Sequence, residues 1–338
     1  MGDILHALPA VTALRQAHPQ WIIDWVVDPR WLPLLAAEPN PETPAAHQPL
    51  VDHIHLAPTR HWRRTPLSRA TFQQIAALRR DLRDAGYHAV LDLQGAIRSA
   101  VVARFAASAR VIGEAEPRER PARFFFTETV MTRGMHVIEQ DMELASAVAG
   151  DELQPMPPLL PLDPAAEAWA DALLPPSSPP AVLINPGAGW GAKRWPVERY
   201  AQVAAALVDR GLRVFANAGP GEERLAAAIE AGTGGAATPL ACTLAELIAL
   251  TRRIRLAIAG DTGPLHLACT LGRPVVGIYG PTDPSRNGPF GVPFRVLRSP
   301  LSRRDHARHA APEAGLLTIQ PADVLYAADE LLAPELAR

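Results

Sequence analysis

The sequence predicts an α/β protein built from two doubly wound domains with a cleft between them. Short β-rich runs alternate with helical patterns in both halves of the 338-residue chain, a pattern typical of parallel strands covered by helices. A proline-rich stretch separates the halves, and a chain of this length is long for a single core. Ligands in such sheets bind outside the carboxyl ends of the strands, so we expect the functional residues there.

The first domain is predicted over residues 1–150. It opens with "MGDILHALPAVTALRQAHP", which indicates a turn entering a helix, and no strand precedes Gly2. A doubly wound domain normally opens with a strand, so we expect that the first strand is missing from this chain. The other predicted elements are strands at 21–27, 53–57 and 89–93 and a helix at 70–87.

A proline-rich linker is predicted over residues 151–180, with a short helix near 165–174, and the second domain over 181–319. Its predicted elements are strands at 181–185, 212–217, 255–260 and 274–280, and helices at 197–211, 221–232 and 243–253. The last predicted helix is amphipathic, and we expect residues 320–338 to cross back onto the first domain.

Composition excludes several classes of function. The formal net charge of −2 gives no electrostatic reason to expect nucleic acid as a partner. The two cysteines, Cys242 and Cys269, form no disulfide framework, and no spacing suggests a zinc site. No apolar stretch reaches the ~20 residues of a membrane span, and no export signal is present. We therefore expect a cytoplasmic protein.

The stretch "AGDTGPLHLACT" follows a predicted strand and opens a helix. Gly263 permits a sharp turn, Thr262 is a candidate helix cap, and Asp261 and His266 stand at the mouth of the turn. A helix N-terminus carries amides and a partial positive charge, so a diphosphate is the expected ligand. An ordinary capped strand–helix junction is the alternative.

Two further strand ends carry candidate ligand-binding residues. Gly187, Ala188 and Gly189 are small enough for backbone to approach a ligand, and Lys193 would neutralise phosphate. A solvated loop lysine is the alternative. Glu222 begins the next helix, where it would either bind ribose hydroxyls or serve the helix terminus as a capping acid.

In the first domain, Asp3 stands at a helix start, where an N-cap aspartate is the simpler reading. Gln94 and Arg98 lie at another strand-to-helix turn. Two basic loops with aromatic residues make an anionic partner plausible, although a charge run is usually a solvated face. Their arginines are Arg60, Arg63, Arg64 and Arg120.

Together these stretches resemble the glycosyltransferase family of the lipopolysaccharide heptosyltransferases (glycosyltransferase family 9), most of all its heptosyltransferase I group. The resemblance rests on "MGDILHALPAVTALRQAHP", "DWVVD", "DLQGAIRSA", "HVIEQ", "KRWP" and "GDTGPLHLACTLGRPVVGIYGPTDP". It implies a GT-B fold with two Rossmann-like domains, the acceptor bound in the first and the nucleotide sugar in the second. It also implies inverting, metal-independent heptose transfer from ADP-heptose to a Kdo residue on lipid A, with no cofactor.

The resemblance also assigns residues. Asp3 is the implied catalytic base and Lys193 the implied diphosphate ligand. Asp261, Thr262, Gly263 and His266 would form the donor site with Glu222 on the nucleoside. Gln94 and the arginines named above would face the anionic acceptor, together with His136 and Glu139. A solvated loop pair is the alternative for His136 and Glu139.

Rival interpretations remain at this stage. The chain could close on a nucleotide sugar without chemistry, or transfer a different heptose or use a different acceptor, as heptosyltransferase II does. A nicotinamide-dependent dehydrogenase is disfavoured because the chain lacks a G-x-G-x-x-G fingerprint. We expect a monomer that meets the cytoplasmic face of the inner membrane peripherally.

Overall fold

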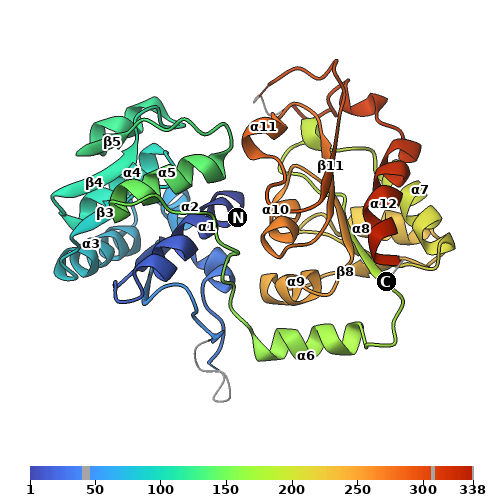
Figure 1. The fold of residues 1–338 in the computed structure, drawn as a ribbon, viewed down its shortest axis with the longest axis horizontal. Helices are drawn as coiled ribbons and strands as arrows, with labels where there is room; N and C mark the ends of the chain where they lie inside the picture. The colour runs from blue at the N-terminus through green and yellow to red at the C-terminus, as the bar shows by residue number, and fades with distance from the viewer. Residues whose placement is uncertain (40–45, 306–308, 337–338) are drawn as a thin grey trace. The chain divides into compact units, whose positions relative to one another are not determined.

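The computed structural model describes residues 1–39, 46–305 and 309–336 (Figure 1). The chain divides into two compact units, the first ending at Leu162 and the second beginning at Asp163. The division falls inside the predicted linker, and residues Pro164–Leu173 of that linker form helix α6, as predicted. Each unit is an α/β arrangement with parallel strands.

The second unit contains a continuous six-stranded parallel sheet with the strand order β8-β7-β6-β9-β10-β11. This order reverses direction between β6 and β9, the point where doubly wound sheets bind ligands. Every residue of β6, β9 and β10 is buried, as expected for strands covered on both faces. The strands are β6 Ala181–Asn185, β7 Arg213–Asn217, β8 Thr238–Leu240, β9 Leu256–Gly260, β10 Val275–Tyr279 and β11 Phe294–Arg298.

Helices cover both faces of this sheet (Figure 1). One core joins the strands to α7, α8 and α12, with Trp195 and Tyr200 among its largest buried side chains. Besides α6, the other α-helices described in the unit are α9, α10 and the short α11. Their bounds are α7 Val197–Asp209, α8 Glu223–Gly232, α9 Leu244–Thr251, α10 Gly263–Thr270, α11 Pro284–Asn287 and α12 Pro321–Leu336.

The C-terminal helix corrects one expectation. We expected it to cross back onto the first domain, but α12 packs against α7 and the edge of the second unit's own sheet. Val324, Ala327, Ala328, Leu331 and Leu332 of α12 lie in that unit's core. An amphipathic stripe needs a partner, and the exposed side of the second sheet supplies it.

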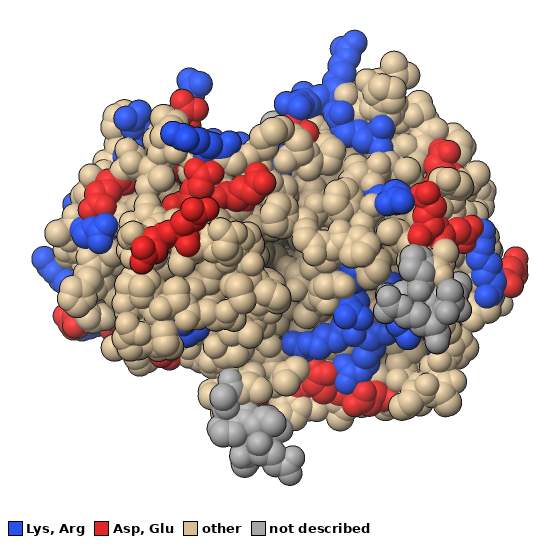
Figure 2. Space-filling view, viewed as in Figure 1, with Lys and Arg blue, Asp and Glu red and all other residues tan. Residues whose placement is uncertain are grey.

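Helix α6 is fixed to α9 by ion pairs. Arg253 Nη1 lies 2.6 Å from Glu167 Oε2, and Arg253 Nη2 lies 2.7 Å from Asp171 Oδ1. Arg252 also pairs with Glu167. Figure 2 shows blue side chains over α9 next to red ones over α6. The helix predicted in the linker is therefore part of the second unit.

The first unit begins with α1 (Gly2–Ala17), in which every residue from Leu5 to Leu14 is buried. No strand precedes α1 among the described residues. The unit's strands fall into two parallel sheets, β1-β2 and β3-β4-β5. The strands are β1 Asp24–Val27, β2 His53–Leu56, β3 Ala89–Leu91, β4 Arg110–Glu114 and β5 Glu128–Val130. The α-helices that follow α1 are α2 Thr59–Arg64, α3 Arg69–Asp84, α4 Ile97–Ala103 and α5 Val137–Ala149.

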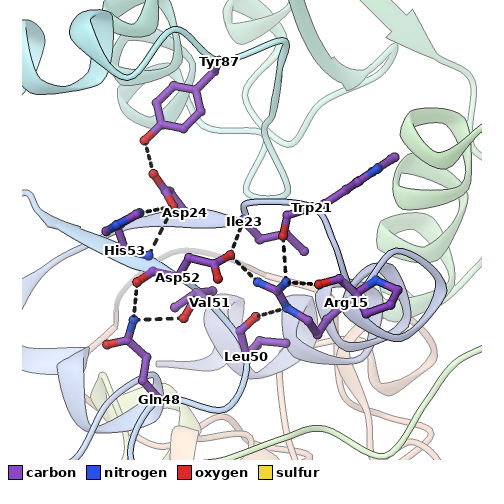
Figure 3. Close-up of polar contacts among 11 residues, drawn as sticks. Arg15, Trp21, Ile23, Asp24, Gln48, Leu50, Val51, Asp52, His53 and Tyr87 are labelled. Carbon is purple, nitrogen blue, oxygen red and sulfur yellow. Dashed lines mark hydrogen bonds and ion pairs between the residues drawn. The ribbon is translucent and has the colours of Figure 1, made fainter. Parts of the chain in front are cut away.

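A polar network anchors the amino ends of β1 and β2 (Figure 3). Arg15, near the end of α1, donates to the carbonyl of Trp21 at 2.7 Å and pairs with Asp52 at 2.5 Å. Asp52 also accepts from the amide of Ile23 at 2.7 Å. Asp24 in β1 accepts from the Tyr87 hydroxyl at 2.5 Å, and burial together with this bond raises the pKa of Tyr87. These contacts tie the end of α1 to the amino ends of β1 and β2.

Candidate functional site

The carboxyl ends of β6 and β9, where the second sheet reverses, bring together the predicted donor-site residues. Gly187 and Ala188 follow β6, and Asp261 and Thr262 follow β9. Thr262 is the N-cap residue of α10, but its hydroxyl donates to the Gly260 carbonyl at 3.2 Å and caps no helix amide. The predicted side-chain cap at Thr262 is therefore wrong, while the predicted strand-to-helix turn is confirmed.

Lys193, Asp261 and His266 form a compact charged cluster at this end of the sheet. The Lys193 ammonium pairs with the Asp261 carboxylate, and its Nζ also lies 3.3 Å from the Asp261 carbonyl oxygen. His266 Nε2 lies 3.2 Å from Asp261 Oδ1. The Lys193 ammonium lies 4.3 Å from the centroid of the Trp190 ring, within cation–π range. Lys193 is therefore held in place, contrary to the alternative of a solvated loop lysine.

Burial and charge act in opposite directions on Asp261. Burial alone would raise its pKa, but the hydrogen bond from His266 and the positive charge of Lys193 outweigh burial. The pKa of Asp261 is therefore held well below its usual range. The side chains of Lys193 and Asp261 are only 11% and 8% exposed, so the pair is little screened by water. The ammonium of Lys193 has a fixed position from which it could meet a ligand's negative charge.

Glu222 contacts the turn that follows β6. Its Oε1 accepts from the amide of Ala188 at 3.2 Å and lies 3.5 Å from Arg194 Nη2. Glu222 is the N-cap residue of α8 but makes no side-chain cap bond, so it does not serve as a capping acid. A Cβ at Gly187 would overlap the Glu222 carboxylate, so a larger residue there would displace Glu222, whereas a Cβ at Gly189 would meet open space.

Two buried asparagines at the same strand ends were missed by the sequence reasoning. Asn217, the last residue of β7, donates to Asn185 Oδ1 at 2.7 Å. Asn185, the last residue of β6, donates in turn to the carbonyl of Gly187 at 3.4 Å. This amide pair links the ends of β6 and β7 to the glycine turn. An asparagine that ends an apolar run was the available signal.

In the first unit, Asp3 lies in the first turn of α1, whose N-cap residue is Met1, so Asp3 is not the N-cap. The Gln94 amide donates to Asp3 Oδ2 at 2.6 Å, and Arg118 Nη1 lies 3.5 Å from Asp3 Oδ1. The Asp3 side chain is 49% exposed. The structure thus joins two residues predicted separately, and it adds Arg118, which the sequence analysis did not select.

Asp92 lies beside these residues and was also missed. It follows β3 and is 5% exposed. Its Oδ1 accepts from the amides of Gln94 and Gly95 at 2.8 and 2.9 Å and from the Ser99 hydroxyl at 3.1 Å. Burial raises its pKa, although these three hydrogen bonds act in the opposite direction.

The remaining residues predicted for the acceptor lie at the surface or cap a helix. His136 is the buried N-cap of α5, where its Nδ1 accepts from the amide of Ile138 at 3.2 Å. Glu139 accepts from the amide of His136 at 2.9 Å. The pair is a capping box and not a solvated loop pair. The five exposed arginines predicted for the acceptor lie on α2, on α4 and at the start of a 3-10 turn: Arg60, Arg63, Arg64, Arg98 and Arg120.

Among the residues that the structure describes, no group of three or more His, Cys, Asp or Glu side chains is arranged to hold a metal ion. None of the helices in the described ranges has both the length and the apolar character needed to cross a bilayer.

Comparisons with known proteins identify a family. A family model described as glycosyltransferase family 9 (heptosyltransferase) matches residues 75–314. Lipopolysaccharide heptosyltransferase 1 of Pseudomonas aeruginosa is 29% identical over 295 residues, covering 86% of this chain and 79% of that protein. Lipopolysaccharide heptosyltransferase 1 of Escherichia coli K12 is 28% identical over 304 residues, covering 89% and 91%.

Solved structures agree with the sequence comparisons. The E. coli heptosyltransferase WaaC with ADP matches with a TM-score of 0.77 at 26% identity, covering 98% of this chain and 97% of that chain. E. coli heptosyltransferase II matches with a TM-score of 0.73 at 22% identity, covering 99% and 96%, and shows the same fold. The fold is therefore that of the GT-B heptosyltransferases, with two Rossmann-like units. The chain belongs to glycosyltransferase family 9 and is a glycosyltransferase of the lipopolysaccharide heptosyltransferase type.

Proposed function

We propose that this enzyme transfers L-glycero-D-manno-heptose from ADP-heptose to a Kdo residue of lipid A, with inversion and without a metal. The observation that carries the proposal is the buried Lys193–Asp261–His266 cluster at the reversal point of the second sheet. Two structures of one relative support the donor, since E. coli WaaC is described with ADP and with ADP-2-deoxy-2-fluoro heptose. The heptosyltransferase 1 relatives support the first-heptose assignment.

In this proposal the second unit binds the donor. Lys193 and the amides at the start of α10, beside Thr262 and Gly263, would neutralise the diphosphate. Negative charge grows on the diphosphate as it leaves, so a preorganised cation stabilises the transition state more than the ground state. Gly187, Ala188 and Gly189 would let the backbone approach the nucleotide, and Glu222 would bind the ribose.

Asp3 would act as the general base. A sugar hydroxyl is a weak nucleophile, so its proton must be taken up as it attacks. The acceptor oxygen forms a bond to the anomeric carbon while the bond from that carbon to the diphosphate oxygen breaks. The proton passes to the Asp3 carboxylate, and ADP departs with the bonding electrons. Direct displacement from the opposite face inverts the anomeric centre.

The acceptor would be recognised by the first unit through charge. Lipid A carrying Kdo is anionic, and Arg60, Arg63, Arg64, Arg98 and Arg120 are exposed. Gln94, His136 and Glu139 were also predicted to face the acceptor. The capping roles of His136 and Glu139 make them supports of α5 in this proposal. Contact with a lipid acceptor would bring the enzyme to the membrane surface peripherally.

The test is transfer from ADP-heptose to Kdo₂-lipid A in the presence of EDTA. ADP release gives the rate, and NMR of the product gives the anomeric configuration. The Asp3→Asn variant should bind donor normally and lose transfer. Net retention of configuration, or an absolute requirement for an added divalent cation, would contradict the mechanism.

A second acceptor tests whether the enzyme transfers the first or the second heptose. Lipopolysaccharide heptosyltransferase 2 of E. coli K12 is 31% identical over 169 residues, which cover 47% of this chain. Heptosyl-Kdo₂-lipid A should therefore be assayed beside Kdo₂-lipid A. Preference for the heptosylated acceptor would replace the first-heptose assignment with the second.

A further inference from the structure

We infer that the turn from Asp92 to Gly95 is a positioning device for Asp3, with Asp92 as its key residue. The inference deepens the proposed function and rests on it, because it treats Asp3 as the base. It concerns residues of the first unit alone. Asp92 is a buried residue that the proposed mechanism leaves without a role. Its Oδ1 accepts three hydrogen bonds, and no group in the described part of the chain bonds its buried Oδ2.

Asp3 is oriented by a contact with Gln94. Its carboxylate projects from the first turn of α1 and is half exposed, so helix packing alone does not fix its rotation. The Gln94 side-chain amide donates to Oδ2 at 2.6 Å. Because this nitrogen can only donate, it holds one carboxylate oxygen and leaves Oδ1 as the oxygen available for a proton. Arg118 lies 3.5 Å from that Oδ1.

Asp92 holds the backbone of Gln94 in place. The backbone amide of Gln94 donates to Asp92 Oδ1 at 2.8 Å, and the next amide, that of Gly95, donates to the same oxygen at 2.9 Å. An aspartate that accepts from amides two and three residues ahead forms an Asx-type turn. The turn fixes the backbone at Gln94, and therefore the direction from which its side chain reaches Asp3.

The same turn also positions Arg118. Gly95 has a φ of +61°, and a Cβ there would lie 3.0 Å from the backbone nitrogen of Arg118. The amide of Glu119 donates to the Gly95 carbonyl at 2.9 Å, and the Glu119 carboxylate accepts from the amide of Ile97 at 2.8 Å. The turn thus holds both groups that contact Asp3: Gln94 through Asp92, and Arg118 through Gly95.

The turn needs a buried oxygen that accepts hydrogen bonds at position 92. Asp92 is only 5% exposed, so water does not compete for the Oδ1 atom that accepts the three hydrogen bonds. An asparagine oxygen can accept the same three hydrogen bonds, and burial favours a neutral group at this place. Geometry, and not charge, is therefore what the site requires of this residue. That distinction makes Asp92 testable as a positioning residue.

The experiment compares Asp92→Ala and Asp92→Asn in the full chain, with ADP-heptose and Kdo₂-lipid A. Asp92→Ala should lower kcat about 10²-fold, the effect of a displacement of about 1 Å at a reacting group. KM for both substrates should stay unchanged, and Asp92→Asn should restore kcat to near the wild-type value. Gln94→Ala should lower kcat in the same way without further loss in the double variant with Asp92→Ala.

Asp52→Ala is the matched control. Asp52 is a carboxylate of the same unit that also holds a backbone amide and a charged side chain, those of Ile23 and Arg15 (Figure 3). Its loss should lower stability without changing kcat. Wild-type kcat in Asp92→Ala, or an Asp92→Asn variant as impaired as Asp92→Ala, would overturn the positioning role while the proposed function stands.

A crystal structure of Asp92→Ala separates this inference from the proposed function. In it, Gln94 should no longer lie within hydrogen-bond distance of Asp3. If wild-type enzyme transfers no heptose, the proposed function fails, and the structure still decides the positioning role. Gln94 unchanged on Asp3 in the variant would overturn the inference.

Discussion

Asp92 follows β3 in the first unit and Asp261 follows β9 in the second, so both carboxyls lie just beyond the end of a parallel strand. Both are largely buried, but their partners differ. Asp92 accepts from two backbone amides and one hydroxyl, whereas Asp261 meets an ammonium and an imidazole. As a result the pKa of Asp92 is raised by burial, and that of Asp261 is lowered by its partners despite burial.

The difference separates two uses of the same position in the fold. In our proposal the Asp92 carboxyl, whose three donors are neutral, shapes a turn and does not need its charge. A carboxylate paired with a buried lysine holds that ammonium group in a fixed position. The two units also differ in the continuity and burial of their sheets. The second unit has one continuous sheet, whereas the described strands of the first unit form two smaller sheets with mostly half-buried strands.

The largest effect on stability is expected at Asp261. Asp261→Asn would leave the Lys193 ammonium buried without a counter-charge, which typically costs about 3–5 kcal/mol in the free energy of unfolding. Asp92→Asn should cost about 1 kcal/mol or less, because the amide oxygen keeps all three donors. Urea unfolding of the two variants at pH 7 measures both values. Equal losses would break the distinction between the two aspartates.

The next effect concerns catalysis. Lys193→Ala should lower kcat about 10²–10³-fold, because it removes the cation proposed to meet the leaving diphosphate. Initial rates of ADP release at saturating substrates measure this. Arg210→Ala is the matched control, since Arg210 is a cation of the same unit in an exposed pair with Asp329. Comparable rates in the two variants would show that Lys193 does not serve the transition state.

A smaller effect is expected at the glycine turn after β6. Gly187→Ala would displace the Glu222 carboxylate, the end of a flexible side chain, and the expected cost is the lost hydrogen bond from the Ala188 amide, about 1 kcal/mol. Gly189→Ala is the matched comparison for stability, since its Cβ would meet nothing within 4 Å. Thermal unfolding without donor should separate the two variants. A lower Tm for Gly189→Ala than for Gly187→Ala would contradict the packing of Glu222 on the turn.

Much of the architecture could be predicted because its signals are local. Apolar runs that end in glycine and aspartate marked the site-bearing ends of β6 and β9, and buried α1 was evident from its apolar residues. Strands β4, β5, β8 and β11 were missed. Of these, β5, β8 and β11 lie at a sheet edge, whereas β4 is the central strand of its sheet. Edge strands need fewer apolar residues, and β8 even carries Pro239.

The site residues that escaped prediction depend on long-range contacts. Asn217 and Asn185, which were not predicted, meet across 32 residues, and the contact between Gln94 and Asp3, which were predicted separately, spans 91 residues. Nothing in the local sequence distinguishes Arg118, which reaches Asp3, from Arg120, which does not in the described contacts. The partner of α12 was mispredicted for the same reason, since an amphipathic face does not specify which sheet it covers.

The smallest expected effect is a difference in the pH dependence of stability. The folded-state pKa of Asp261 lies below its unfolded value of about 3.9, so its contribution is full above that pH and is lost as the pH falls below it. The folded-state pKa of Asp92 is raised, so its relative contribution is present below about 3.9 and is lost as the pH rises through the folded value. Compared with wild type, Asp92→Asn should therefore be relatively more stable at pH 7 than at pH 3.5, and Asp261→Asn relatively less stable. Urea unfolding at the two pH values gives the sign of the change in the free energy of unfolding for each variant. If both variants change in the same direction, the partners of Asp92 and Asp261 do not shift the two pKa values in opposite directions.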